Sequence, residues 1–270
     1  MSNVSIDTHD NKIAKFRTKL SRTVTLDGVW CVGLSEITYT KSWYNVLNSV
    51  PIVLYDEMGN DYIPNEEIKN DFTLLAGYYE TSQKLIGELN KIFDKFNYMT
   101  PPKLEYNEIN NKVTLHAGKA KELNVYPYLG DEIEDLLGLK NRNFNKNIYS
   151  TDVNTDVDHV FKEKESYTST SITGYHPVEI TAGYQSLYLY SDIVYPSLIG
   201  DTCAPILRLI EVPRKYKFGD TVHLKYDKPH YRQLLCNNFE TIELALYDDS
   251  GNLVPFKFGK IAVTLHFKKL

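Results

Sequence analysis

Cysteine is scarce in this sequence, and no two cysteines lie close together. The 270 residues include three, Cys31, Cys203 and Cys236, with no C-x-x-C spacing. An odd number of widely separated cysteines predicts neither a disulfide framework nor a zinc site. We therefore expect buried, reduced thiols in a protein that stays inside the cell.

Long apolar runs are also missing. No stretch approaches the roughly 18 consecutive apolar residues of a membrane-spanning helix. The opening residues MSNVSIDTHDNKIAK are polar and lack the apolar centre of a secretory signal. We expect no membrane span and no secretion through a signal peptide.

The chain has no excess of basic residues. Its formal net charge is −5 and its isoelectric point is about 5.8. A dedicated nucleic-acid binder usually carries clustered positive charge. We therefore expect no specific binding to nucleic acid.

Recognisable catalytic and cofactor motifs are absent as well. The sequence has no phosphate loop, no G-x-G-x-x-G, no G-x-S-x-G elbow and no H-E-x-x-H. The seven histidines are scattered, so no two have the short spacing of shared metal ligands. The sequence predicts a protein that is not an enzyme and that uses no cofactor or metal.

Two acidic clusters have simpler explanations than chemistry. TDVNTDVDHV at 151–160 lacks the spacing of an EF-hand loop, so we expect a solvated loop. DDSGN at 248–252 has the composition of a tight turn, in which Asp and Gly tolerate unusual backbone angles. Neither cluster predicts a site.

The sequence is rich in segments with the composition and alternation of β-strands. Twenty-one Tyr and eleven Phe favour strands, and about ten segments bounded by turn signals alternate or are rich in β-branched and aromatic residues. SLYLYSDIVYP at 186–196 alternates strictly. The final stretch, 242–269, predicts two strands joined as a hairpin by the turn at 248–252, with Ile242, Leu244 and Leu246 facing inward.

Helical signals are few. TSQKLIGELNKIFDKF at 81–96 has Leu85, Leu89 and Phe93 at helical spacing, with Thr81 or Ser82 as its cap. DEIEDLLG at 131–138 predicts a short helix that stops at Gly138. The first twelve residues are polar, and 140–172 is rich in Asn, Asp, Lys, Ser and Thr.

These elements define an all-β, mainly β fold class. We expect a single jelly-roll β-sandwich over 13–270, with one substantial helix and a polar loop insertion near 140–172. A flexible arm, 1–12, would precede it.

Several stretches together resemble the minor capsid (penton) proteins of Polinton/Maverick elements and related virophage-like and adintovirus-like viruses. They span most of 13–268 in the same order: FRTKL…VTLDGVWCVGLSEITYTKSWYNV, LLAGYYETSQKLIGELNKIF, LYLYSDIVYPSLIGDTCAPILRLIEVP and FETIELALYDDSGNLVPFKFGKIAVTLHFK. The resemblance implies a structural subunit that forms homopentamers at the fivefold vertices of an icosahedral capsid. It also implies a double jelly-roll major capsid protein as partner, and a place in the virion after assembly inside the host cell.

Subunit contacts are expected at tyrosines and at outward residues of the last strand. Tyr offers a large rigid face with a polar tip, although half-buried sheet positions explain the same tyrosines equally well. The candidates are Tyr188, Tyr190, Tyr195, Lys260, Thr264, His266 and Lys268. Two alternatives remain. The one ranked last is a metal-dependent enzyme on a jelly-roll barrel, which needs two His and one carboxylate as metal ligands, and no short-spaced H-x-[DE] motif occurs in the sequence. The other is a jelly-roll module that binds a ligand or carbohydrate without a capsid role. It would be a monomer or small oligomer with a concave, aromatic site.

Overall fold

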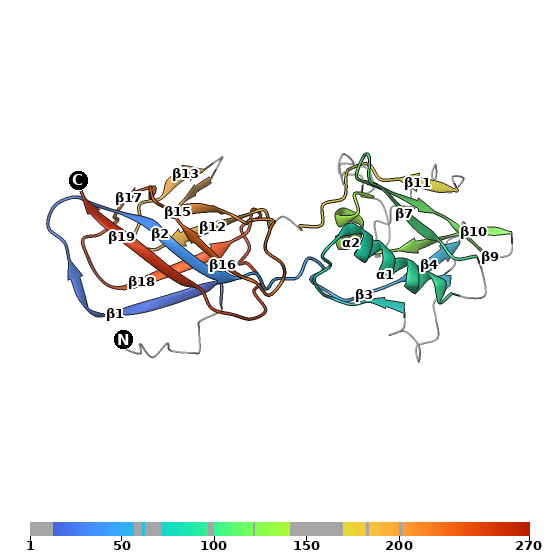
Figure 1. Ribbon diagram of the computed structural model, residues 1–270, viewed down its shortest axis with the longest axis horizontal. Helices are drawn as coiled ribbons and strands as arrows, with labels where there is room; N and C mark the ends of the chain where they lie inside the picture. Colours follow the sequence, from blue (N-terminus) through green and yellow to red (C-terminus); the bar gives the residue numbers. More distant parts are fainter. Residues whose placement is uncertain are drawn as a thin grey trace, which may run out of the picture. The chain divides into compact units, whose positions relative to one another are not determined.

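The described residues of the computed structural model form two compact units (Figure 1). These residues are 13–56, 61–62, 72–96, 100–120, 122–140, 170–181, 184–199 and 202–270. Unit 1 comprises Met1–Tyr44 and Gly183–Leu270, and unit 2 is Asn45–Ala182. The sequence predicted one domain over 13–270 and did not predict this division. The expected arm 1–12 and most of the expected insertion near 140–172 lie outside the described residues.

Unit 1 is a sandwich of two antiparallel sheets. Sheet A has the order β1 (Lys15–Thr25), β18 (Asn238–Tyr247), β12 (Ser186–Ser191), β15 (Ile206–Glu211). Sheet B is centred on β2 (Trp30–Thr40), which pairs on one side with β19 (Ala262–Lys269) and on the other with β16 (Thr221–Lys225) and β17 (Arg232–Gln233). A separate hairpin joins β13 (Ser197–Ile199) and β14 (Thr202–Ala204).

This strand order is that of a jelly roll. In an eight-stranded jelly roll, one sheet holds the second, seventh, fourth and fifth strands, and the other holds the first, eighth, third and sixth. The order β1-β18-β12-β15 matches the first sheet, and β19-β2-β16 matches the last three places of the second. The predicted mainly-β jelly-roll class is therefore confirmed, with its strands in unit 1.

The last two strands do not form the predicted hairpin. β18 pairs with β1 and β12, whereas β19 pairs with β2 in the other sheet. The turn between them is formed as expected, because the Asp248 carboxylate accepts hydrogen bonds from the backbone N–H groups of Ser250 and Asn252. The inward side chains of β18 are also as predicted, with Leu246 fully buried.

The core of the sandwich lies between the two inward faces. On β2, Val32 and Leu34 are fully buried, and on β12 in the other sheet, Leu187 and Leu189 also have no exposed surface. Since successive side chains of a strand point to opposite faces, these positions leave their neighbours on the outside of the sandwich.

Unit 2 combines short sheets with the two helices of the described chain. The strands with their bounds are β3 (Val50–Pro51), β4 (Val53–Asp56), β5 (Asp61–Tyr62), β6 (Thr73–Leu74), β7 (Lys103–Asn107), β8 (Lys112–His116), β9 (Gly118–Ala120), β10 (Leu123–Tyr128) and β11 (Ser171–Thr173). They pair as β5-β4-β10-β9, β11-β8-β7 and β3-β6. The β7–β8 hairpin turns at Asn111, which has a positive φ of 55°.

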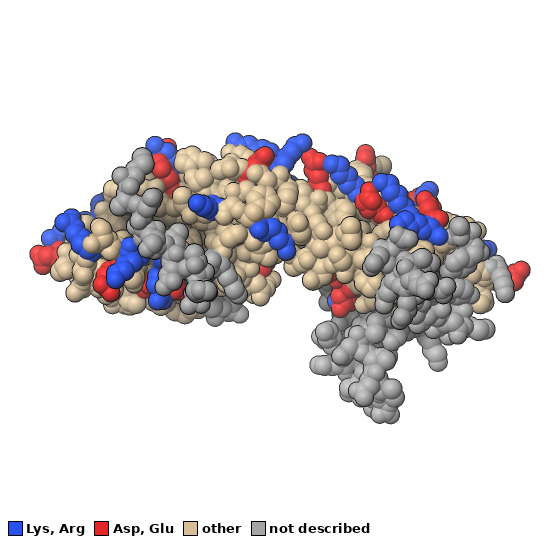
Figure 2. All heavy atoms as spheres, turned by 90° about the horizontal axis from the view of Figure 1, so that it is seen from below, with Lys and Arg blue, Asp and Glu red and all other residues tan. Residues whose placement is uncertain are grey.

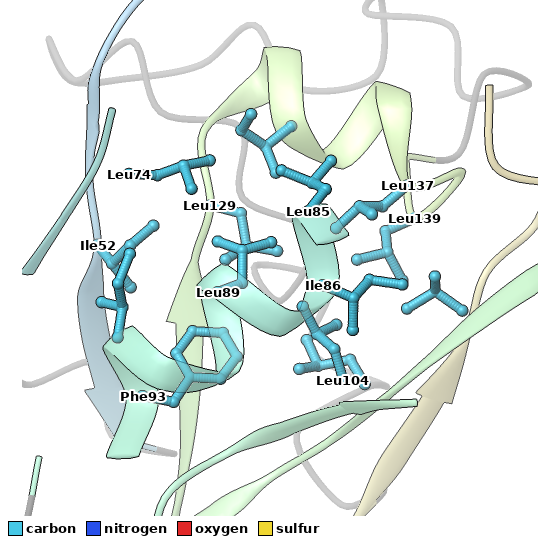
Figure 3. Close-up of a cluster of buried hydrophobic side chains, with 14 of the residues drawn as sticks. Ile52, Leu74, Leu85, Ile86, Leu89, Phe93, Leu104, Leu129, Leu137 and Leu139 are labelled. Carbon is cyan, nitrogen blue, oxygen red and sulfur yellow. The ribbon is translucent and has the colours of Figure 1, made fainter. Parts of the chain in front are cut away.

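Helix α1 (Ser82–Asp94) confirms the predicted helix. The Thr81 side chain accepts a hydrogen bond from the backbone N–H of Lys84 and so caps the first turn. Figure 3 shows Leu85, Leu89 and Phe93 pointing from α1 into a cluster of aliphatic side chains. Packing of this apolar stripe, more than intrinsic propensity, stabilises a helix of this length.

Helix α2 (Asp131–Leu136) confirms the second, shorter prediction. Gly138 follows it with φ of 69°, a left-handed conformation that glycine adopts without strain. An added Cβ at this position would lie 2.1 Å from the carbonyl oxygen of His176. Glycine is therefore required both by the backbone angle and by the close approach of the neighbouring segment.

Candidate functional site

The predicted contact residues divide between the two outer faces of the jelly-roll sandwich. Tyr188 and Tyr190 point outward from sheet A, because the residues that alternate with them on β12 are buried in the core. Thr264, His266 and Lys268 are exposed and point outward from sheet B. The structure therefore presents two separate surfaces instead of one.

The first surface, called here the tyrosine face, consists of Tyr188, Tyr190, Tyr247 and Leu209. Tyr188 lies directly opposite Tyr247 on β18 and Leu209 on β15, so all three share one face of sheet A. The rings of Tyr190 and Tyr247 have centroids 4.6 Å apart. Leu209, on the edge strand β15, is 50% exposed, so this face carries an exposed apolar side chain beside the aromatic rings.

The three tyrosines of this face are partly buried. Burial raises the pKa of the Tyr190 hydroxyl, and the neighbouring Tyr247 and Tyr188 add to that shift. The Tyr190 hydroxyl therefore stays protonated at neutral pH and can donate a hydrogen bond at the edge of an apolar centre.

Charged groups border the tyrosine face on β18 and β1. The Glu243 carboxylate lies 3.0 Å from the Lys15 ammonium and 2.8 Å from the Arg17 guanidinium. Burial alone would raise the pKa of Glu243, but hydrogen bonds and charge from Lys15 and Arg17 outweigh it and lower that pKa. The Asp192 carboxylate accepts a 2.9 Å hydrogen bond from the backbone N–H of Glu243. An aromatic centre with a charged border is the usual anatomy of a protein interface.

The second surface, called here the histidine face, consists of Thr264, His266, Lys268 and Tyr231. The Tyr231 hydroxyl and His266 Nδ1 are 3.0 Å apart, and the two rings meet edge to face with centroids 5.8 Å apart. The Lys268 ammonium lies 5.6 Å from the centre of the Tyr231 ring. These contacts fix three polar side chains of sheet B in one exposed group.

Two predicted residues lie apart from both groups. Tyr195 is 49% exposed, and its backbone N–H donates to the carbonyl of Gln233 on β17. Lys260 is exposed and precedes β19. Sequence alternation did not identify Tyr231, Tyr247 or Leu209, because their positions depend on pairing between strands far apart in the chain.

Groupings typical of metal chemistry do not occur in the part of the chain that the structure describes. No three His, Cys, Asp or Glu side chains there are placed to hold a metal ion. Cys31 is buried as predicted, but Cys203 and Cys236 are exposed, which corrects the expectation of three buried thiols. Among the described helices, none has the length and apolar character needed to cross a membrane.

One buried acid stands out in unit 2. Glu134 on α2 is 2% exposed, and its Oε2 atom has no hydrogen-bond partner among the described residues. Burial, with a smaller contribution from Asp131, raises the pKa of Glu134 to about 8, against the opposing effects of the Leu129 backbone and Lys140. Glu134 is therefore protonated at neutral pH and is a source of pH-dependent stability.

Charge of both signs is mixed on the surface drawn in Figure 2. Lysine and arginine side chains there alternate with aspartate and glutamate on each unit, without a continuous basic field. This distribution agrees with the net charge of −5. A continuous positive stripe is the usual electrostatic footprint of a nucleic-acid binder.

The solved structures that resemble this chain include two viral proteins. No protein-family model matches the chain, and no curated protein matches it. The mavirus penton protein aligns with a TM-score of 0.47 and 11% identity, over 96% of this chain and 92% of that one. The Sputnik virophage structure aligns with a TM-score of 0.39 and 11% identity, over 95% of this chain and 92% of the matched chain. Since both scores are below 0.5, the fold assignment rests on the strand order of unit 1.

Proposed function

We propose that this chain is a structural virion protein, a penton subunit that forms homopentamers at the fivefold vertices of an icosahedral capsid. The observation that carries the proposal is the tyrosine face, a partly buried aromatic group with an exposed leucine on the outside of a jelly-roll sheet. Aromatic centres with charged borders are where binding energy concentrates in protein interfaces. The resemblance of the sequence to penton proteins of Polinton/Maverick elements and related viruses supplies the biological setting.

The two outer faces of the jelly-roll sandwich could form the contacts of a closed ring of subunits. A closed ring of five copies uses a heterologous contact, in which two different surfaces of each subunit meet. The tyrosine face and the histidine face lie on opposite outer faces of the same sandwich. We assign the tyrosine face of each copy to contact the histidine face of the next, with tyrosine hydroxyls close to His266 and Lys268.

The proposal extends to partners and location. The sequence resemblance implies that such rings sit among trimers of a double jelly-roll major capsid protein, within the virion and after assembly inside the host cell. A subunit of this kind acts through its surfaces and needs neither catalysis nor a cofactor. The face drawn in Figure 2 carries charges of both signs, which supports contacts with protein at that face.

The direct test is the mass and shape of the purified full chain. Light scattering is expected to give five times the 31.1 kDa of one chain, and negative-stain images are expected to show rings with fivefold symmetry. A chain that stays monomeric at high concentration contradicts the ring. If such a monomer also binds oligosaccharides on a glycan array, the alternative of a carbohydrate-binding module is supported instead.

A further inference from the structure

Two segments of unit 1 share a short pattern that the proposed ring does not use. RKYKFGD at 214–220 and KFGK at 257–260 both contain Lys-Phe-Gly. They lead into β16 and β19, the strands on either side of β2 (Figure 1). Gly219 and Gly259 have φ angles of 90° and 98°, which glycine adopts without strain. The same pattern therefore precedes both neighbours of one strand.

The residues that follow β2 hold the two segments in place. The backbone N–H of Gly219 donates to the Lys41 carbonyl over 2.8 Å. On the other side, the backbone N–H of Lys257 donates to the Ser42 carbonyl over 3.0 Å. The buried Ser42 hydroxyl donates to the Phe258 carbonyl over 2.5 Å. Three parts of the chain that are far apart in sequence consequently meet in a fixed arrangement.

Three aromatic rings come together where these parts of the chain meet. The Tyr44 and Phe218 rings have centroids 5.7 Å apart, and Phe218 meets Phe258 edge to face at 5.6 Å. Phe258 is 46% exposed, and Tyr44 and Phe218 are half-buried. Contacts between the rings stabilise the two segments and still leave aromatic surface in water. The cluster therefore offers a ligand a rigid aromatic surface.

Basic side chains are concentrated in the same two segments. The Lys257 ammonium lies 4.7 Å from the centre of the Tyr44 ring, and the Lys215 ammonium lies 5.0 Å from that of Tyr216. Positive charge and aromatic surface thus occupy one place. The three rings and the five exposed basic residues are called here the aromatic–basic patch, which consists of Tyr44, Phe218, Phe258, Arg214, Lys215, Lys217, Lys257 and Lys260.

The local charge of the patch differs from that of the whole chain. Asp220 is the one acid in the two segments, which leaves an excess of four positive charges there, whereas the net charge of the chain is −5. Salt screens charges that lie more than about 10 Å apart. A ligand at the patch therefore experiences the local excess, and the overall charge does not describe this place.

We propose that the aromatic–basic patch binds single-stranded nucleic acid without regard to base sequence. Basic side chains that contact phosphates and exposed rings on which bases stack are the two parts of such sites. An acidic polysaccharide would use the charges and leave the rings without bases to stack on them. The proposal goes beyond the capsid role, because no residue of the patch belongs to the tyrosine face or the histidine face. It gives Lys260, which lies apart from both faces, a contact with phosphate.

The first test is fluorescence anisotropy of a labelled thymidine dodecamer with the full chain. We expect a dissociation constant below about 10 μM in about 50 mM salt. An abasic dodecamer has the same phosphates but no bases, and it is expected to bind at least about tenfold more weakly. Absence of binding overturns the proposal. Equal binding of the abasic strand also overturns it and shows a surface for polyanions in general.

Removal of two rings tests the stacking. Phe218→Ala combined with Phe258→Ala is expected to weaken binding of the thymidine dodecamer at least about tenfold and to change binding of the abasic strand little. The control is Tyr175→Ala in unit 2, because Tyr175 is also 46% exposed. Unchanged affinity for the thymidine dodecamer in the double variant overturns the assignment of the site.

Removal of two exposed charges tests the phosphate contacts. Each contact with a single strand contributes about −0.7 to the slope of log affinity against log salt, so Lys257→Gln with Lys260→Gln should make the slope less steep by about 1.4. Lys84→Gln with Lys91→Gln, on α1, changes the net charge equally and should leave the slope unchanged. Because all four side chains are exposed, this comparison holds even where loss of the two rings disturbs folding. Equal slopes in the two lysine variants overturn the proposal.

The same measurement separates this proposal from the proposed ring. The Leu209→Arg variant, which blocks the tyrosine face, should bind the thymidine dodecamer as the unsubstituted chain does. Sedimentation reports the ring and anisotropy reports the patch, so failure of one is distinguished from failure of the other.

Discussion

The free energy of unfolding of unit 2 is expected to fall by about 5 kcal/mol as pH rises from about 4.5 to 8, because of Glu134. Burial raises the pKa of this carboxyl from 4.5 to about 8. Between these two values the folded chain holds a proton that the unfolded chain releases. The contribution is therefore fully present below the unfolded pKa and lost as pH rises through the folded one, with no further change above it.

The Glu134→Gln substitution separates the contribution of Glu134 from the other pH-dependent contributions to the stability of unit 2. Glu134→Gln keeps an acceptor for the Leu129 backbone but cannot ionise, so its unfolding free energy should lack this pH-dependent loss. Both tryptophans, Trp30 and Trp43, lie in unit 1, and both described helices lie in unit 2. Helical circular dichroism in urea therefore follows unit 2. The exposed control Glu122→Gln should retain the full pH dependence of the unsubstituted chain. The same slope in the Glu134→Gln variant would contradict the account.

Phe93→Ala is expected to destabilise unit 2 by about 3–5 kcal/mol. Phe93 has no exposed surface and lies in the cluster of Figure 3, near Leu89 and Ile52. Removing the ring takes away its burial energy and leaves a cavity that the sheets around α1 fill only in part. A loss of this size is comparable to the whole stability of many small units.

The control for this substitution lies on the same helix. Lys91 is exposed and forms an ion pair with Glu88, and Lys91→Ala should change stability by no more than about 0.5 kcal/mol. Urea unfolding followed by helical circular dichroism measures both variants, with tryptophan fluorescence reporting unit 1 in the same samples. A Phe93→Ala variant as stable as Lys91→Ala would show that the cluster does not hold unit 2 together.

The elements that sequence predicted well are those defined by local signals. Helix α1 has its cap at Thr81 and its apolar stripe within thirteen residues, and helix α2 is followed by Gly138 in a left-handed conformation. The pairing of strands could not be predicted in the same way, because alternation shows which side chains face inward but not which strand lies alongside. The adjacent β18 and β19 therefore looked like a hairpin, although the jelly roll places them in different sheets.

No local pattern in the sequence indicates the division into two units. Unit 2 is inserted between β2 and β12, and its segments carry the same alternating pattern as those of the sandwich. Only some residues of the two candidate surfaces could be predicted from the sequence. Alternation placed Tyr188 and His266 on outer faces, but Leu209 and Tyr231 join them only through pairing across long stretches of chain.

Mixing two interface variants shows directly whether the ring forms by contact between two different outer faces. Leu209→Arg places a charge in the tyrosine face, Thr264→Arg adds one to the histidine face, and Ile109→Arg is the control at a 95% exposed position of unit 2. Sedimentation velocity is expected to show pentamers for the unsubstituted chain and the control, and monomers for each interface variant alone. An equal mixture of the two interface variants should form dimers, because each partner keeps one intact face. Pentamers in both interface variants, or monomers of the unsubstituted chain, would show that no such ring forms through these two faces.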